Sequence, residues 1–556
     1  MGDPVHDAVV VGSGAGGAPV ALALAREGFS VLVLEKGRRY SSDQFVHDEI
    51  ATVRRDFFVP SVADDPHVLV REGEPKGNRS TFGWIATCVG GGTVHMAGHF
   101  YRLHPVDFRM ASEFGRSREI PLADWPLRYE DLEPWYALAE REIGVAGSAG
   151  ANPFDPPRSG EYPLPPVETH PAGAWIDDAC AALGLHAFRE ARAILSRPYR
   201  ERAACLYCDF CGSYGCEAGA KSSTLSSLVP DAEATGKCKV VERAAVFRIE
   251  VAPDGRATGC LYRDARGETH RIRARIVVLA CSAIETARLL LLSKTPAFPD
   301  GLANSSGQVG RNLQFSSFTT GSGVFELASL DDARRDTILE RHPFLGRSVQ
   351  DFYRLPPGVS DLDKGGTLRF GFPHPNPIFR AIQLAHRGGW LAWGMELKER
   401  MEEHWHRTRT IEFETFADFL PNPGTYVDLD PDTNDARGEP AARIHLAVPE
   451  HHARAGRFLQ EKGLEILDKA GAHRLDRGET AGTTGHLVHG TCRAGTDPRD
   501  SVLDPEGRAH DVPNLYVTDG AYFPTAGGVA TTLTILANSF RIADRILERA
   551  RRGDFR

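Results

Sequence analysis

The feature that most constrains this chain is a glycine motif between two apolar runs near its N-terminus. Residues 6–35 read HDAVVVGSGAGGAPVALALAREGFSVLVLE, with three glycines in G-x-G-x-x-G spacing followed by a segment rich in Ala and Leu. The apolar runs at 8–11 and 31–34 are typical of parallel strands buried on both faces, and the segment between them is typical of a helix. The pattern predicts the first βαβ unit of a Rossmann-like sheet that binds a dinucleotide.

Each residue of the motif has a mechanical role in such a unit. Gly12 permits the tight turn, Gly14 lets the backbone approach a pyrophosphate, and Gly17 lets helix and strand pack closely. The helix N-terminus then faces the phosphates. Glu35 ends the second strand, where its carboxylate would accept hydrogen bonds from ribose hydroxyls and repel a 2′-phosphate, which argues against NADP. The alternative is a glycine-rich turn with no ligand.

The composition excludes several classes of protein. A chain of 556 residues is long enough for two to four domains, and its charged (25%) and apolar (42%) fractions are ordinary for a soluble protein. The net charge of −9 is spread along the chain, so nothing suggests a nucleic-acid partner. No apolar run is long enough to span a membrane. The first strand begins almost at the N-terminus without a leader, which predicts a cytoplasmic protein.

Several later segments predict elements of the same fold. Residues 239–280 indicate a small antiparallel meander that returns to a buried parallel strand at 276–280. A helix should follow over 282–293, with Ser282 as N-cap and Glu285 in the capping-box position. A short buried strand at 515–518 and a final helix over 533–550 complete the pattern, and residues 149–171 indicate a surface crossover.

Four stretches give the chain a specific resemblance: the N-terminal motif, CVGGGTVHMAGHFYRLHPVDF (88–108), VVLACSAIETARLLLLS (277–293) and GTCRAGTDPRDSVLDPEGRAHDVPNLYVTDGAYFPT (490–525). In order and spacing the chain resembles the glucose–methanol–choline (GMC) oxidoreductases over nearly its full length. The resemblance implies FAD rather than NAD, and oxidation of a CH–OH group by hydride transfer to flavin. It implies an α/β fold with a Rossmann-like FAD domain, a parallel sheet plus a small antiparallel meander, over 1–125, 205–315 and 485–556. An α+β substrate domain over 126–204 and 316–484 is inserted discontinuously.

The resemblance also implies further contacts with FAD. The family places the segment Gly91, Gly92, Thr93, Val94 and His95 along the flavin ring, where backbone N–H groups face developing charge. His95 either bonds the flavin covalently or only packs against it, since relatives do both. Asp519 and Gly520, after the strand at 515–518, resemble the residues that meet the phosphate–ribityl region, and Asp519 could equally cap a helix or turn.

A second motif is a run of four cysteines within twelve residues: Cys205, Cys208, Cys211 and Cys216. Closely spaced thiolates can converge on one soft metal centre. The spacing has one residue more than the C-x2-C-x2-C-x3-C run of ferredoxins, and it differs from paired C-x2-C zinc sites. The chain resembles sugar and polyol dehydrogenase flavoproteins here, which implies an iron–sulfur cluster near the flavin; zinc or unligated thiols are the alternatives.

The catalytic pair departs from the family pattern. The family places a base three residues before its Gly-Thr, which is Leu487 here, with His486 and His489 on either side. Either imidazole could accept the alcohol proton, and His486 is favoured because a one-residue shift restores the register. The family's partner Asn or His is replaced by Ala530. Thr531 or Thr532 could substitute weakly, or Asn538 could reach in, but none of these is in register.

These observations predict an FAD-dependent dehydrogenase that oxidises a sugar, glycoside or polyol and passes electrons through an iron–sulfur cluster to a cytochrome or quinone partner. An oxidase that uses O₂ is the second hypothesis. A flavoprotein with non-standard or lost alcohol-oxidising activity is the third, because of Ala530. Relatives exported with a small chaperone subunit that carries the signal make a periplasmic location the alternative to the cytoplasm.

Overall fold

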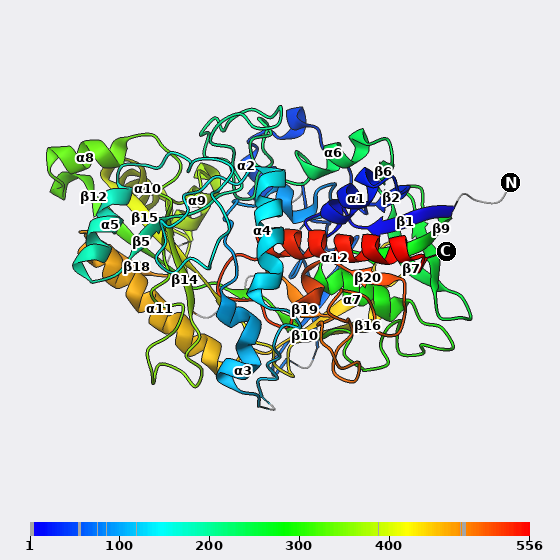
Figure 1. The fold of residues 1–556 in the computed structure, drawn as a ribbon. Coiled ribbons are helices and arrows are strands. Elements are labelled where there is room, and N and C mark those ends of the chain that lie inside the picture. The colour runs from blue at the N-terminus through cyan, green and yellow to red at the C-terminus, as the bar shows by residue number, and fades with distance from the viewer. Residues whose placement is uncertain are drawn as a thin grey trace.

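The structure is a computed structural model, and it describes residues 5–53, 57–74, 76–84, 86–117, 119–386, 389–478, 480 and 485–555. It is built around two large sheets at opposite ends of the molecule (Figure 1). The helices are α1 Gly17–Arg26, α2 Glu49–Val53, α3 Met110–Phe114, α4 Tyr129–Ile143, α5 Gly173–Ala182, α6 Leu228–Ala234, α7 Ala283–Leu292, α8 Asp332–Leu339, α9 Pro377–Ala385, α10 Gly394–Glu402, α11 Glu450–Lys469 and α12 Thr532–Arg552. None of the helices within the described ranges is long and apolar enough to cross a membrane.

The first sheet has the predicted Rossmann-like core, and its order is β6-β2-β1-β9-β8-β7, with β20 paired to β9. Its strands are β1 Val5–Val11, β2 Val31–Leu34, β6 Cys238–Val241, β7 Ala245–Val251, β8 Ala257–Arg263, β9 Thr269–Leu279 and β20 Leu515–Val517. β1 pairs in parallel with β2 and β9, whereas β7, β8 and β9 form an antiparallel meander. The predicted parallel strands and the meander are therefore confirmed.

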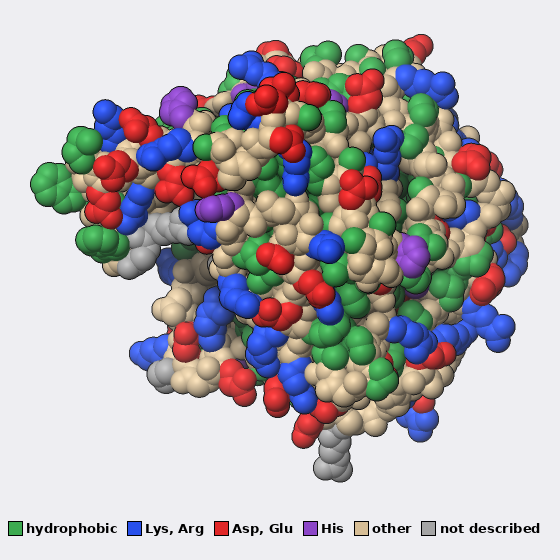
Figure 2. Space-filling model, turned by 90° about the vertical axis from the view of Figure 1, so that its left-hand side faces the viewer, with side chains coloured by type: hydrophobic (Ala, Val, Ile, Leu, Met, Phe, Trp, Pro, Cys, Tyr) green, Lys and Arg blue, Asp and Glu red, His purple; other side chains and the backbone are tan. Residues whose placement is uncertain are grey.

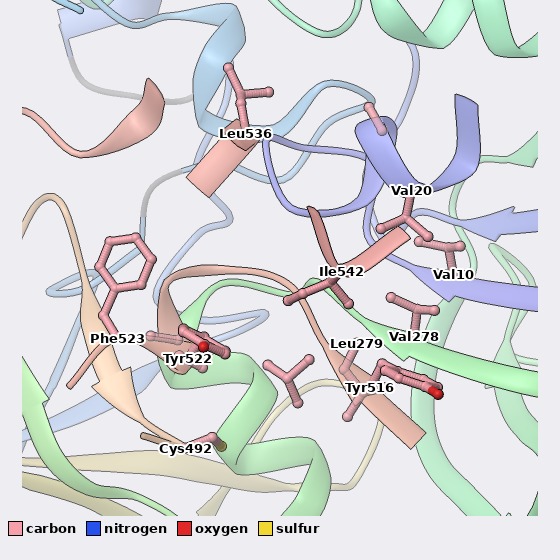
Figure 3. Packing of buried hydrophobic residues seen from close by; sticks show 14 of the residues in the cluster. Val10, Val20, Val278, Leu279, Cys492, Tyr516, Tyr522, Phe523, Leu536 and Ile542 are labelled. Carbon is pink, nitrogen blue, oxygen red and sulfur yellow. The ribbon is translucent and has the colours of Figure 1, made fainter. Parts of the chain in front are cut away.

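The central strands of this sheet are Val-, Ile- and Leu-rich because helices cover both faces. Figure 3 shows Val10 of β1 and Val278 of β9 beside Val20 of α1 and Ile542 of α12. All four side chains are fully buried. The last helix, α12, thus packs against the first βαβ unit, which brings the two ends of the chain to one side of the molecule (Figure 1).

The second large sheet has the order β18-β12-β15-β14-β13-β5, and β11 pairs with β15. Its strands are β5 Ala187–Arg189, β11 Ser316–Ser317, β12 Thr320–Glu326, β13 Arg347–Val349, β14 Gly366–Gly371, β15 Thr408–Asp418 and β18 Arg474–Arg477. Along β15, Ile411, Phe413 and Ala417 join the core with α5 and α11. The alternate residues, Glu414 and Phe416, face the other way, toward the first sheet.

Two small sheets connect the large ones. One has the order β16-β17-β3-β4, with β3 His67–Arg71, β4 Asn78–Ser80, β16 Tyr426–Asn434 and β17 Pro440–Leu446. The other pairs β10 (Arg311–Gln314) with β19 (His489–Thr491). β19 carries His489, one of the predicted catalytic histidines.

The N-terminus of α7 lies where the sequence predicts it, but its capping differs from the predicted capping box. Ser282 is the N-cap residue, but it has a φ of +76° and its side chain makes no capping hydrogen bond. Glu285 pairs with Lys36 and Arg288 instead of reaching back to the cap. The role expected of Glu285 is taken by the carboxylate of Asp519, which accepts from the Ser282 backbone N–H. A local sequence pattern could not reveal this contact.

Candidate active site

A cavity of about 420 Å³ lies between the two large sheets and contains most of the predicted cofactor and catalytic residues. At one end it is lined by the first glycine loop, Glu35 and Asp519. At the other end it is lined by His486, His489 and side chains of the second sheet. One continuous space therefore joins the predicted dinucleotide site to the predicted catalytic site.

The first glycine loop has the geometry that its motif requires. Gly12 has a φ of +100°, and a Cβ on Gly17 would lie 2.0 Å from the carbonyl oxygen of Gly12. These two glycines thus serve the turn and the close contact between helix and strand. A Cβ on Gly14 would meet nothing closer than 3.7 Å, so the fold itself leaves room there. Gly14 is required only if another molecule approaches the loop.

Glu35 lies at the end of β2, buried against the glycine loop. Its Oε2 accepts hydrogen bonds from the Ser13 backbone N–H (3.1 Å) and hydroxyl (2.6 Å), and its Oε1 accepts one from Gly37 N–H (2.9 Å). Burial raises the pKa of Glu35. The carboxylate lines the cavity, where ribose hydroxyls would find an acceptor.

The second glycine segment forms a 3₁₀ turn, η2 (Gly91–Val94), that lies beside the first loop. Gly90 N–H donates to the Ser13 hydroxyl (2.9 Å), and the Thr93 hydroxyl donates to Gly90 O (2.6 Å). Gly91, Gly92 and Thr93 line the cavity. Val94 points away from it, into an apolar cluster with Tyr40, Phe45, Phe58 and Cys88.

Asp519 joins β20 to the start of α7 and is one of the buried charges at the cavity. Its Oδ1 accepts from Ala521 N–H (2.8 Å) and its Oδ2 accepts from the Thr286 hydroxyl (2.6 Å). Backbone N–H groups of Cys281 and Ser282 also donate to the carboxylate, while burial raises its pKa to about 6. Asp519 caps a short 3₁₀ turn, as one of the two interpretations expects. Together with Gly520 it also lines the cavity, while its predicted contact with FAD remains a prediction.

His489 is fully buried and paired with a residue that the sequence placed out of register. Its Nε2 lies 2.5 Å from the hydroxyl of Thr531, and its ring is nearly parallel to Phe523 with centroids 5.4 Å apart. Its Nδ1 has no hydrogen-bond partner among the described residues. Burial lowers the pKa of His489 to about 3, so the imidazole is neutral at physiological pH.

His486 lies on the same cavity wall but is only half-buried. Leu487 follows it with a φ of +51°, a left-handed backbone that is strained for leucine. This local twist lies between the two histidines, and both line the cavity although neither occupies the family register. His486 is therefore the more accessible of the two, and His489 is held by the Thr531 hydroxyl.

His95 lies at the end of η2, where its ring stacks on Phe58 with centroids 5.3 Å apart. It lines the cavity and is half-buried, so the imidazole has access to any group placed along the turn. Its carbonyl oxygen accepts a hydrogen bond from Ser213 N–H (2.8 Å). This bond ties the turn to the cysteine loop.

Another part of the cavity wall comes from segments that contain no recognisable sequence motif. It contains the polar side chains of His99, His374 and Glu414 and the rings of Phe318 and Phe416. The alternation of Glu412, Glu414 and Phe416 within β15 was the one local signal for it. Glu414 is the carboxylate at this end of the cavity, and the Arg369 guanidinium lies 3.5 Å from it.

A buried ion network holds this wall in place. Glu190 Oε2 lies 3.0 Å from His99 Nδ1, and its Oε1 accepts from Arg192 (2.6 Å). The neighbouring charges lower the pKa of Glu190, although burial alone would raise it. Burial lowers the pKa of His99. The result is a rigid polar surface opposite the predicted base.

The four cysteines lie in one loop, and all are free thiols. Cys205 Sγ accepts from Tyr207 N–H (3.3 Å), and buried Lys221 donates to the carbonyl oxygens of Cys211 and Tyr214. Burial raises the pKa of Cys205 to about 12. Within the described residues no three cysteine sulfurs lie within 4.8 Å of one another, so the loop does not form a compact tetrahedral zinc site. Gly212 and Ser213 of the same loop line the cavity.

Comparison with known proteins identifies the family to which this architecture belongs. Residues 165–316 and 421–539 match the two GMC oxidoreductase family models, and residues 10–50 match an NAD(P)-binding Rossmann-like domain. The chain is 33% identical to 2-methyl-1,2-propanediol dehydrogenase of Mycolicibacterium austroafricanum, over 98% of this chain and 95% of that protein. It is 28% identical to the fructose dehydrogenase large subunit of Gluconobacter japonicus, over 98% of each chain.

Among solved structures, the fold is similar to that of a formate oxidase variant from Aspergillus oryzae RIB40, whose structure addresses FAD modification in that enzyme. The TM-score is 0.61 with 16% identity, and all of both chains is covered. The Rossmann-like core, the cavity between the sheets and the near full-length relatives all indicate the same family. The chain belongs to the GMC oxidoreductase family and is an oxidoreductase that acts on CH–OH donors.

Proposed function

We propose that this protein is an FAD-dependent dehydrogenase that oxidises a CH–OH group of a sugar, glycoside or polyol. The observation that carries the proposal is the single cavity that runs from the glycine loop and Glu35 to His486 and His489. A dinucleotide needs the first end, and an alcohol that loses a proton and a hydride needs the second. The names of two near full-length relatives, a diol dehydrogenase and a fructose dehydrogenase subunit, support the substrate class.

The residues at the cavity fit FAD. Gly14 leaves space that the fold does not use, and Gly91 has a φ of +53° with its Cα facing the first loop. Glu35 would hold the ribose, and the N-terminus of α1 would face the phosphates. Bound flavin would supply the hydride acceptor. His95 lies beside the cavity, so both a covalent bond to the flavin and simple packing agree with its position.

The proton would be taken by His486. A general base must reach the alcohol O–H and have a pKa near the working pH, and a half-buried imidazole on the cavity wall meets the first condition. His489 meets the second condition poorly, because burial lowers its pKa to about 3. His489 and Thr531 would instead hold the wall on which the substrate hydroxyl rests, in place of the pair that the family builds with Asn or His.

The opposite wall favours a polyhydroxylated substrate. Phe318 and Phe416 offer apolar surface to C–H groups, while Glu414, His99 and His374 offer hydrogen-bonding groups to hydroxyls. Ligand sites commonly combine an apolar lining with a few fixed polar groups in this way. Glu414→Gln should raise KM for a polyol more than it lowers kcat, because the carboxylate is a stronger hydrogen-bond acceptor than the amide.

The route of electrons out of the flavin is a separate part of the proposal. An iron–sulfur cluster on Cys205, Cys208, Cys211 and Cys216 would lie close to the flavin, because Ser213 of the same loop bonds to His95 and lines the cavity. The relative named as a large subunit supports a partner protein as acceptor. Iron and acid-labile sulfide analysis of anaerobically purified protein tests the cluster, with the Cys208→Ser variant as its control.

The decisive experiment for the function is anaerobic stopped-flow reduction of the purified yellow protein with a panel of diols, polyols and sugars. Bleaching of the flavin by at least one of these alcohols is expected. Rapid reoxidation by air with formation of hydrogen peroxide would favour the oxidase alternative. Flavin that stays oxidised with every alcohol, or protein that carries no FAD, would refute the proposal.

A further inference from the structure

A second feature of the molecule lies outside the cavity, on the helical pair α9 and α10. We call Pro377–Glu402 the arm. Its two helices are joined by Ala392 N–H, which donates to Ala385 O (2.7 Å), and by Arg400, which donates to Leu384 O (2.8 Å). Leu384, Ala385 and Ala392 are buried on its inner side. These contacts join the two described parts of the arm, 377–386 and 389–402.

The outer side of the arm exposes large apolar side chains to an unusual degree. Trp393 is 80% exposed and Trp390 is 59% exposed. Five further large apolar side chains of the arm are exposed: Ile378, Phe379, Ile382, Leu391 and Met395. In the space-filling view, the projection at the left carries hydrophobic side chains at its end, with acidic and basic side chains between them (Figure 2).

The size of this surface is informative. With about 150–250 Å² for each fully exposed large side chain, the seven residues expose roughly 700–800 Å² of apolar surface. The largest apolar patch on a monomeric protein is usually about 300–600 Å². A standard protein–protein interface buries about 800 Å² on each partner. The arm alone thus offers the area that one side of a stable dimer needs.

We infer that the arm is the interface through which two copies of this chain associate. Residues 377–402 contain four basic and three acidic residues, so the arm is nearly neutral and carries both signs. Several of these charges are paired around the apolar surface, as in Arg400–Glu396 (2.7 Å) and Arg380–Glu412 (3.1 Å). A surface of mixed sign can complement itself across a twofold axis, where each residue meets its counterpart's neighbours.

Other occupants fit the arm less well. A helix that lies on an anionic membrane carries a basic polar face, whereas α10 places Glu396, Glu399 and Glu402 among its cations. A strongly charged partner protein would find no net opposite charge. β1 and the end of α12, which lie close to the two described ends of the chain, are at the opposite end of the molecule from α9 and α10 (Figure 1).

The arm follows closely on His374, which lines the cavity, so association through the arm has a consequence there. Glu49 accepts hydrogen bonds from the first N–H groups of α9, including Ile378 N–H (2.8 Å). Asn376, just before α9, accepts from the Tyr214 hydroxyl (2.6 Å), and His374 lines the cavity. A second copy seated on α9 would therefore restrict movement of the segment beside the substrate wall.

Sedimentation velocity of the FAD-loaded protein tests this inference, without substrate or turnover, so its result is independent of the proposed function. The wild-type chain should sediment as a dimer at micromolar concentration. The double variant Trp390→Glu/Trp393→Glu should sediment as a monomer, with its flavin content and circular dichroism unchanged. Leu339→Glu is the matched control, because Leu339 is an exposed apolar residue on α8, outside the arm, and it should remain dimeric.

Co-sedimentation with phosphatidylcholine vesicles, with and without phosphatidylserine, addresses the membrane alternative. Wild-type protein should stay in the supernatant with both kinds of vesicle. Vesicle binding that the two Trp→Glu substitutions abolish would overturn the inference in favour of a membrane. A wild-type monomer at all micromolar concentrations, or a dimer that survives the double substitution and Ile382→Lys, would also overturn it.

Discussion

His489 Nε2 lies 2.5 Å from Thr531 Oγ1, one residue beyond the alanine that replaces the family's partner residue. The pair is fully buried and faces the cavity, with Phe523 stacked on the other side of the imidazole. The hydroxyl therefore supplies the fixed polar contact that Ala530 cannot make. This relationship weakens the hypothesis that the Ala530 substitution abolished activity, and it separates the roles of the two histidines.

Replacing His486 with Ala should slow anaerobic flavin reduction by about 10²–10⁴-fold, the usual loss when a general base is removed. His489→Gln should have a smaller effect on this rate, since that imidazole is held by Thr531 and stays neutral. Stopped-flow reduction at saturating alcohol measures both. A large loss in the His489 variant with a normal rate in the His486 variant would reverse the assignment.

Thr531 should act as a positioning residue, and its two closest analogues separate that role from mere packing. Thr531→Val keeps the volume but removes the hydroxyl, leaving His489 with an unpaired nitrogen at a cost of about 1–3 kcal/mol. Thr531→Ser keeps the hydroxyl and should keep the pH profile of kcat. Equal behaviour of the Val and Ser variants would exclude a role for the hydrogen bond.

Ala530→Asn should leave the rate of flavin reduction unchanged or increase it, because an amide could then orient the substrate hydroxyl.

Gly14→Ala should give a folded protein that lacks FAD. A Cβ at this position meets no atom of the fold closer than 3.7 Å, so the free energy of unfolding of the apoprotein should be nearly unchanged. The methyl group would instead occupy the space that the pyrophosphate needs. Gly17→Ala is the contrasting variant, since its Cβ would lie 2.0 Å from Gly12 O and should prevent folding. Flavin absorbance and circular dichroism distinguish the two outcomes.

Lys364 is a buried cation whose loss should destabilise the protein strongly. Its Nζ lies 3.1 Å from Asp107 and 3.0 Å from Asp418, and all three side chains are almost completely buried. Lys364→Met would leave both carboxylates without their cation, at a cost of about 3–5 kcal/mol measured by chemical denaturation. A loss below 1 kcal/mol would contradict this expectation.

Tyr353→Phe should reveal what that ion network does for the cavity. The Tyr353 hydroxyl donates to Asp107 (2.6 Å) and accepts from Gly528 N–H (3.1 Å), three residues before Thr531. The variant should lower kcat more than it raises KM, because the loop that presents Thr531 loses an anchor. Unchanged kcat with reduced stability would show that the network is only structural.

Acidification should destabilise the protein through buried histidines. Burial lowers the pKa of His451 to about 4, whereas an unfolded histidine titrates at about 6.5. The unfolded state therefore binds more protons between these values, so this contribution is complete above pH 6.5 and is lost as the pH falls. His451→Asn should reduce the loss of unfolding free energy between pH 7 and 5 by about 2 kcal/mol.

The sequence by itself determined the fold around the cofactor. The apolar runs at 8–11 and 31–34, the three glycines and the meander before residue 280 are local patterns, and each constrains its own backbone. The parallel pairing of β1 with β2 and β9 follows from them. The same patterns gave most of the cavity lining at the FAD end, because glycines in such loops act through the backbone.

Only the tertiary structure decided how the other end of the cavity is built. Thr531 reaches His489 because a strained turn at Leu487 and the packing of α12 place them together across 42 residues. Val94 turns into the core, Asp519 rather than Glu285 accepts the Ser282 N–H, and Glu414 lines the same cavity as the histidines from another sheet. These contacts join residues far apart in the chain, and a local pattern carries no information about which distant side chain will fill a given space.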